Sequence, residues 1–171
     1  MMKTWSITDV GLVRKENQDA YRIARGGDVC VVCDGMGGAA GGQIASTLAA
    51  ETYAAELEKI LKPDMTPEQL REASSYAVAM ANLAVENRAS EDDELSNMGT
   101  TLVSAIAYEG GAVVTNVGDS RAYYITRAGI TRITKDHSLV ESMVDHGDIT
   151  ADEARHHPSR NLITRALGRD T

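Results

Sequence analysis

The sequence predicts an α+β protein, in which strands and helices are grouped separately along the chain. Short apolar strands come first, two long helical segments follow, and the second half contains strands joined by glycine turns. A chain that alternated single strands with single helices would instead predict a parallel sheet. With 171 residues, of which 43% are apolar and 25% charged, residues 1–171 are expected to form one globular domain.

The N-terminal strands are predicted from alternating polarity and from turn residues. Residues Thr4–Val10 alternate between apolar and polar side chains, which predicts a first strand. Residues Ala20–Ala24 and Val29–Cys33 are predicted as two further strands joined by a two-glycine turn. The glycine-rich stretch Asp34–Gly42 predicts a break in all regular structure before the helices begin.

Helical periodicity starts at Gln43. The spacing of Ile44, Leu48 and Leu57 predicts a first helix that ends before Pro63. The segment Thr66-Pro-Glu-Gln69 then supplies an N-cap, a proline in the first turn and a glutamine at the third helical position, so a second helix is expected to start there. Small residues on its apolar stripe favour close packing on a sheet.

The second half of the chain is predicted to contain two β-hairpins followed by two short helices. The hairpins and the helix after them comprise Thr101–Tyr108 with Ala112–Val117, Arg121–Thr126 with Ile130–Thr134, and Ser138–His146. A capping box at Thr150-Ala-Asp-Glu153 predicts the last short helix.

Charge and cysteine content limit the partners and the compartment. The net charge of −8, without a run of Lys or Arg, argues against binding to nucleic acid or to an anionic membrane. Residues 1–11 lack the apolar stretch of a signal peptide, so a cytoplasmic location is expected. Cys30 and Cys33 lie three residues apart on one predicted strand and therefore point to opposite faces, which argues against a disulfide or a shared metal.

Three aspartates follow strands or precede glycines. Asp34 ends an apolar strand and precedes Gly35, Asp119 follows another strand, and Asp19 lies between two strands. Carboxylate and carbonyl oxygens are the ligands that Mg²⁺ and Mn²⁺ prefer, but aspartates are also common in turns, so both interpretations stay open. Arg14 is either an anion partner or a surface charge.

Several motifs occur together in the order and approximate spacing of one known family. They are Arg14-Lys-Glu-Asn-Gln-Asp19, Val32-Cys-Asp-Gly-Met-Gly-Gly38, Gly99-Thr-Thr101, Val117-Gly-Asp-Ser-Arg121, Thr134-Lys-Asp-His-Ser138 and Asn161-Leu-Ile-Thr-Arg-Ala-Leu-Gly168. On these motifs the chain resembles the bacterial members of the metal-dependent Ser/Thr protein phosphatases, the PPM or type 2C family. The resemblance covers nearly the whole chain.

The resemblance implies a fold and a set of ligands. The fold would be a four-layer αββα sandwich, two antiparallel sheets flanked by helices, incomplete in this chain. Asp34 would bridge two Mn²⁺ or Mg²⁺ ions and the Gly35 carbonyl would bind one of them. Asp19 would bind the second ion directly or through water, Asp119 would belong to a third, weaker ion, and Arg14 would hold the substrate phosphate.

The resemblance also implies an activity. Members hydrolyse phosphoserine and phosphothreonine in proteins with a metal-activated water, usually in opposition to a Ser/Thr kinase. Residues 145–161 would form a mobile flap beside the site. Some members have a histidine at the position of Met36 as the proton donor to the leaving group; here a metal-bound water, His137 or His146 would have to take that role.

The family's later Ser-Asp-Gly and terminal Asp-Asn motifs do not occur before Thr171. The chain is therefore expected to be the N-terminal two-thirds of the phosphatase domain, truncated at the C-terminus. Two alternatives follow: a catalytically impaired fragment or pseudophosphatase that acts as a binding module, or a hydrolase of small phosphoesters.

Overall fold

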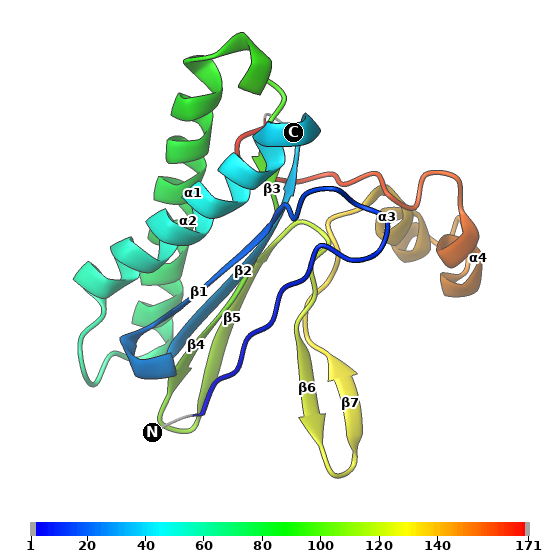
Figure 1. The fold of residues 1–171 in the computed structure, drawn as a ribbon. Helices are drawn as coiled ribbons and strands as arrows, with labels where there is room; N and C mark the ends of the chain where they lie inside the picture. The colour runs from blue at the N-terminus through cyan, green and yellow to red at the C-terminus, as the bar shows by residue number, and fades with distance from the viewer. Residues whose placement is uncertain (1–2, 170–171) are drawn as a thin grey trace.

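A computed structural model describes residues 3–169 and contains one larger antiparallel sheet covered by two long helices (Figure 1). The strands lie in the order β1-β2-β4-β5, and the short β3 pairs with the end of β2. Their bounds are β1 Asp19–Ala24, β2 Val29–Met36, β3 Gly99–Thr100, β4 Leu102–Tyr108 and β5 Gly111–Val117. The predicted α+β class with antiparallel sheets is confirmed.

Helices α1 (Gly38–Ile60) and α2 (Pro67–Ser90) pack against each other and against one face of the sheet. The predicted capping box at the start of α2 is present, because Thr66 and Gln69 exchange hydrogen bonds between side chain and backbone. Alanines along both helices are buried against the strands, so that the helices lie close to the sheet.

A chain of hydroxyl groups crosses this core. The Tyr53 hydroxyl of α1 lies 2.7 Å from Ser74 Oγ of α2 and 2.6 Å from Ser104 Oγ of β4. Ser74 Oγ in turn lies 2.6 Å from Thr115 Oγ1 of β5. These contacts satisfy polar groups that would otherwise be buried without partners, and they fix the depth at which both helices sit on the sheet.

The predicted strand at Thr4–Val10 is wrong. The segment is extended but pairs with no strand among residues 3–169. Trp5 and Ile7 are 83% and 93% exposed, so their alternation does not bury an apolar side. Residues 5–9 instead line a cavity of about 410 Å³ with the outward side chains of β1 and β2, on the sheet face opposite to α1 and α2.

The predicted break at Asp34–Gly42 is also wrong over most of its length. Strand β2 continues to Met36, and α1 begins at Gly38. Two glycines in the first turns of α1 pack closely against other segments. A Cβ on Gly42 would lie 2.8 Å from the Gly35 carbonyl carbon, too close without a shift, and one on Gly41 would be tight at 3.1 Å from Met98 Cβ. The glycines therefore permit close packing rather than breaking the helix.

The second half of the chain follows the prediction closely. The first predicted hairpin is β4–β5. A separate two-stranded sheet is formed by β6 (Tyr123–Thr126) and β7 (Gly129–Arg132). Helices α3 (Leu139–His146) and α4 (Ala151–His156) follow, capped by Ser138 and Thr150.

The last described segment returns to the main sheet: Leu167 and Thr100 exchange two backbone hydrogen bonds of 2.9 and 3.1 Å. The described residues thus contain one helical layer, the main sheet and the small β6–β7 sheet, an incomplete version of the expected sandwich. No helix within residues 3–169 is long and apolar enough to cross a membrane.

Candidate functional site

Asp19 and Asp34 form a directly opposed pair across strands β1 and β2. The next pair along the register, Ala20 and Cys33, is buried in the core beneath the helices. Because side chains alternate along a strand, Asp19 and Asp34 leave the opposite face of the sheet. Both carboxylates line a cavity of about 440 Å³ together with Arg14 and Gly35, so four of the five predicted site residues come together.

The main chain at Asp19 is held by the preceding turn. The Asp19 amide donates to Asn17 Oδ1 at 3.0 Å, an Asx-type bond that orients the start of β1. Asn17 Nδ2 donates in turn to Thr8 Oγ1 at 2.7 Å, which ties this turn to the extended N-terminal segment. Asn17 was part of the quoted motif but had no predicted role.

Two threonines hold the main chain of Asp34. Thr101 Oγ1 accepts from the Asp34 amide at 3.0 Å, and the Thr101 amide donates to the Asp34 carbonyl at 2.9 Å. Thr100 Oγ1 donates to the same carbonyl at 2.9 Å. Both threonines are fully buried. The sequence analysis assigned them no role, although the Gly99-Thr-Thr101 motif was the available signal.

Gly35 lies where β2 passes the start of α1. Its amide donates to the Gln18 carbonyl at 3.1 Å, and Ser46 Oγ of α1 donates to the same carbonyl at 2.6 Å. A Cβ on Gly35 would lie 1.9 Å from the Gly42 carbonyl oxygen. Glycine is therefore required by this close approach, whichever ligand its own carbonyl binds.

Two other carboxylates, those of Asp19 and Asp119, lie close enough to Asp34 to affect its pKa. The pKa of Asp34 is raised to about 6, chiefly because its carboxyl loses contact with water and next because the charges of Asp19 and Asp119 repel it. A hydrogen bond with the Asp19 carboxyl adds to the rise, and the positive charge of Arg14 opposes it. The fifth predicted residue, Asp119, thus lies close enough to Asp34 to act on its protonation.

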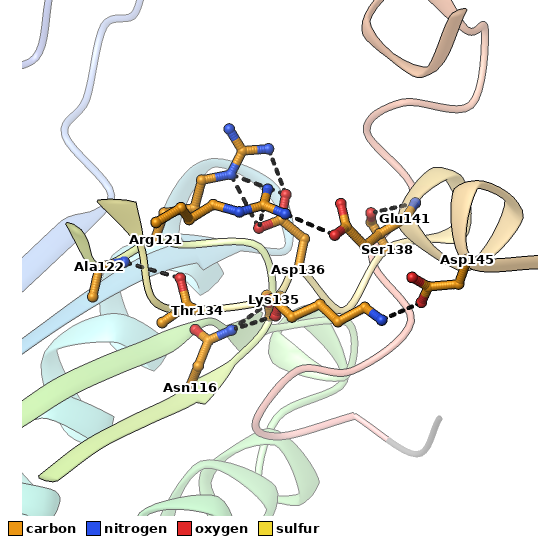
Figure 2. Close-up of polar contacts among 11 residues, drawn as sticks. Asn116, Arg121, Ala122, Thr134, Lys135, Asp136, Ser138, Glu141 and Asp145 are labelled. Atoms are coloured by element: carbon orange, nitrogen blue, oxygen red, sulfur yellow. Dashed lines mark hydrogen bonds and ion pairs between the residues drawn. The ribbon is translucent and has the colours of Figure 1, made fainter. Parts of the chain in front are cut away.

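Asp119 nevertheless lines a different cavity, of about 500 Å³, with residues of β7, α3 and α4. Arg121 and Asp136 also line this cavity, and Figure 2 shows their ion pair, in which Nε of Arg121 donates to both carboxylate oxygens of Asp136 at 3.0 Å. Arg132 joins this buried carboxylate to Glu141 of α3, at 3.6 and 2.7 Å. The segment that carries Asp119 is therefore anchored to the base of the β6–β7 hairpin and to α3.

The two histidines considered as proton donors lie outside the cavity that contains Arg14, Asp19 and Asp34. His137 Nδ1 accepts from the Gly118 amide at 3.1 Å, so a neutral ring carries its proton on Nε2. Burial lowers the pKa of His137, and the charge of Arg165 lowers it further. His146 is exposed on α3, with Nδ1 2.7 Å from the Ser142 carbonyl. Met36 of β2 has no proton to donate.

The donors at the Asp19–Asp34 pair are suited to a hard divalent cation. Two carboxylates, with the Gly35 backbone beside them, are oxygen ligands, and a cation would relieve the repulsion that raises the Asp34 pKa. Within residues 3–169, no group of three or more His, Cys, Asp or Glu side chains is close enough to hold a metal.

Fold and site together define a class of α+β protein with paired carboxylates and an arginine on the open face of an antiparallel sheet. Residues 13–162 match the family model described as protein phosphatase 2C. The chain belongs to this family, as its motifs predicted.

Two curated relatives illustrate the similarity. The chain is 34% identical over 164 residues to the serine/threonine phosphatase stp of Listeria monocytogenes. This match covers 94% of this chain and 65% of the relative. It is 38% identical over 161 residues to the serine/threonine protein phosphatase PstP of Mycobacterium tuberculosis, covering 94% of this chain and 30% of PstP. The chain thus spans just under two thirds of the first relative's length and less than a third of the second's.

Solved structures of serine/threonine phosphatases are also similar to this chain. The serine/threonine phosphatase Stp1 of Staphylococcus aureus superposes with a TM-score of 0.87 at 36% identity, over 96% of this chain and 65% of Stp1. The catalytic domain of PstP in complex with two manganese ions superposes with a TM-score of 0.76 at 33% identity, over 94% of this chain and 65% of that domain.

Proposed function

We propose that this chain carries the Arg14, Asp19, Asp34 and Gly35 part of a metal-dependent protein phosphatase site, and that its reaction is hydrolysis of phosphoserine and phosphothreonine in proteins. The observation that supports this most directly is the convergence of the opposed Asp19–Asp34 pair with Arg14 in one cavity. The protein phosphatase 2C relatives support the substrate class. Phosphoproteins made by a Ser/Thr kinase in the cytoplasm are the substrates that fit this proposal.

Each residue has a distinct role in the proposed reaction. Asp34 and the Gly35 carbonyl would hold the core pair of Mn²⁺ or Mg²⁺ ions, Asp19 would bind the second ion, and Asp119 a third. Bound divalent cations supply positive charge, which lowers the pKa of water and offsets the charge of a phosphate dianion. The planar guanidinium of Arg14 can bind two phosphate oxygens at once and so orient the phosphorus for in-line attack by water.

A second candidate is a binding role without turnover. It is supported by the small number of acidic side chains that converge at the site, because no cluster of three metal-binding side chains forms within residues 3–169. Such a chain would still bind a phosphorylated partner through Arg14, without hydrolysing the ester.

One set of assays separates the possibilities. We expect a phosphatase domain that contains this chain and extends to the family's usual end to release phosphate from a phosphothreonine peptide with Mn²⁺ but not with a chelator, and Asp34→Asn to abolish release. Residues 1–171 alone should be inactive or far weaker. Asp28→Asn, an exposed aspartate outside the site at the start of β2, is the matched control and should keep wild-type activity. Hydrolysis that persists with chelator or in Asp34→Asn would refute the proposal.

The alternatives have their own signatures. Metal-dependent hydrolysis of p-nitrophenyl phosphate without any hydrolysis of the peptide would identify a small-phosphoester hydrolase. Peptide binding measured by calorimetry, lost in Arg14→Ala and accompanied by no hydrolysis of either compound, would identify the binding module.

A further inference from the structure

Thr101 contacts the segments of both Asp34 and Asp119. Its hydroxyl, already the acceptor for the Asp34 amide, lies 2.6 Å from Ser120 Oγ, immediately after Asp119. On the other side of Asp119, a Cβ added to Gly118 would lie 2.6 Å from Thr101 Cγ2, so the Thr101 methyl packs on the backbone there. One buried side chain thus contacts both neighbours of Asp119 and the backbone of Asp34.

The hydroxyl bonds have a preferred direction. Thr101 is fully buried, and its oxygen already accepts from the Asp34 amide, so its own proton needs an acceptor. Ser120 Oγ is the acceptor within reach, whereas half-buried Ser120 can direct its proton to solvent. The bridge therefore runs from the Asp34 amide through Thr101 to Ser120.

This bridge links two segments that are not neighbours in the sheet. Asp34 lies in β2 and Asp119 follows the end of β5, and these two strands are not neighbours in the sheet. The two carboxylates carry like charges close enough to interact. Strand β4 lies between β2 and β5, and Thr101 immediately precedes β4. A residue at that point is placed to set the separation of the two carboxylates.

We propose that Thr101 and Ser120 are positioning residues that set the separation of Asp34 and Asp119, and through it the affinity for the ion that depends on Asp119. The inference rests on the proposed metal site. It assigns a role to the Gly99-Thr-Thr101 motif and to the serine after Asp119. Groups of this kind, which orient the ligands themselves, commonly change metal affinity by about ten- to a hundredfold when removed.

The experiment is a Mn²⁺ titration by calorimetry of the whole chain. Asp119→Asn identifies the ion that depends on Asp119. Ser120→Ala, which removes only the bridge, should weaken that ion by about tenfold and leave the other binding unchanged. Thr101→Val should weaken it at least as much, and Thr101→Ser, which keeps the hydroxyl, should restore it. Thr115→Val, which removes a hydroxyl bonded to Ser74, is the matched control and should bind as wild type.

The double variant Asp119→Asn with Ser120→Ala decides whether Ser120 acts through Asp119. It should bind Mn²⁺ no more weakly than Asp119→Asn alone. An additional loss in the double variant, or wild-type binding by Ser120→Ala and Thr101→Val, would overturn the inference.

A metal-free readout separates this inference from the proposed function. In ¹⁵N relaxation measurements, Ser120→Ala and Thr101→Val should increase the mobility of the Asp119 amide, and Thr101→Ser should not. Wild-type protein that binds no Mn²⁺ would count against the proposed function alone, and the relaxation data would still decide the positioning role. Unchanged Asp119 mobility in both variants would overturn it.

Discussion

Asp19 and Asp34 stand directly opposite each other on neighbouring antiparallel strands, on the sheet face that α1 and α2 leave open. Like charges in such a cross-strand pair destabilise a sheet unless something neutralises them. The pair is therefore a cost to the isolated fold, and a cation or a proton removes that cost. The stability of the metal-free chain should therefore fall as the pH rises and Asp34 loses its proton.

The pH prediction concerns Asp34 in chelator. Its folded pKa of about 6 lies above the ordinary 3.8, so the folded state binds this proton more tightly than the unfolded state. The contribution of Asp34 to stability is therefore complete below about pH 3.8 and is lost as the pH rises through 6. Asp34→Asn should be more stable than wild type at pH 7, and the difference should shrink toward pH 4.

Urea unfolding of both proteins at several pH values measures this difference. Mn²⁺ at pH 7 should stabilise wild type more than Asp34→Asn, because the substitution removes a carboxylate of the proposed Asp19–Asp34 ion site. A stability difference that is the same at pH 4 and pH 7 would show that Asp34 is not perturbed by its neighbours.

Arg14→Ala should weaken phosphate recognition. Loss of the guanidinium removes two hydrogen bonds to phosphate, so we expect KM for a phosphopeptide to rise by about tenfold, with a smaller change in kcat. Arg14→Lys should recover only part of the affinity, because an ammonium group lacks the planar fork. Arg127→Ala, in the turn of the β6–β7 hairpin, is the control. A normal KM in Arg14→Ala would rule out this role.

His137 should make the fold sensitive to acid. Its folded pKa lies below the ordinary 6.5, so its contribution to stability is complete above pH 6.5 and is lost as the pH falls through the folded pKa. Protonation also removes the acceptor for the Gly118 amide. His137→Asn offers an acceptor that does not titrate, so wild type should lose stability relative to this variant between pH 7 and pH 5. Thermal unfolding of the two proteins across this range provides the test, and parallel pH profiles would contradict it.

Tyr53→Phe should destabilise the core by about 1–2 kcal/mol, because it leaves Ser74 and Ser104 without their shared buried partner. Tyr124→Phe, on the exposed β6 strand, should change the free energy of unfolding by less than about 0.5 kcal/mol. Urea unfolding measures both values. Equal effects in the two variants would mean that the hydroxyl chain does not stabilise the contact between helix and sheet.

Elements with a local signal were predicted correctly. The capping boxes at Thr66 and Thr150 mark the starts of α2 and α4, because the bonds that form them lie within three residues. The strand predicted at Thr4–Val10 was wrong because alternating polarity indicates an extended chain but does not show whether another strand pairs with it. The predicted start of α1 was wrong for a different reason. Gly41 and Gly42 suggested a break, but they are small residues placed where segments distant in sequence pack closely on the helix.

In the candidate site, too, some features could be predicted from the sequence and others could not. Position relative to strands pointed to Asp19, Asp34 and Asp119, and Arg14 was selected for its guanidinium and for the family resemblance. Arg14, Asp19 and Asp34 share a cavity, whereas Asp119 lines another. The direct opposition of the two aspartates depends on strand register, and the register depends on how the turn between β1 and β2 closes. Thr101 could not be recognised as a link to Ser120, because the two residues are 19 apart and meet only when β4 and β5 pair. The roles of the ligands and of the flap at residues 145–161 stay predictions.

The bonds from Thr100 and Thr101 to Asp34 all involve its main chain and leave its carboxylate untouched. The path of β2 at this point is thus independent of which side chain residue 34 carries. The groups that hold the strand therefore differ from the group proposed to bind the cation. Replacing the Asp34 carboxylate by an imidazole or a thiolate should change which cation binds, while β2 keeps its path. Position 34 is accordingly the first position to vary when the ion preference of the proposed site is tested.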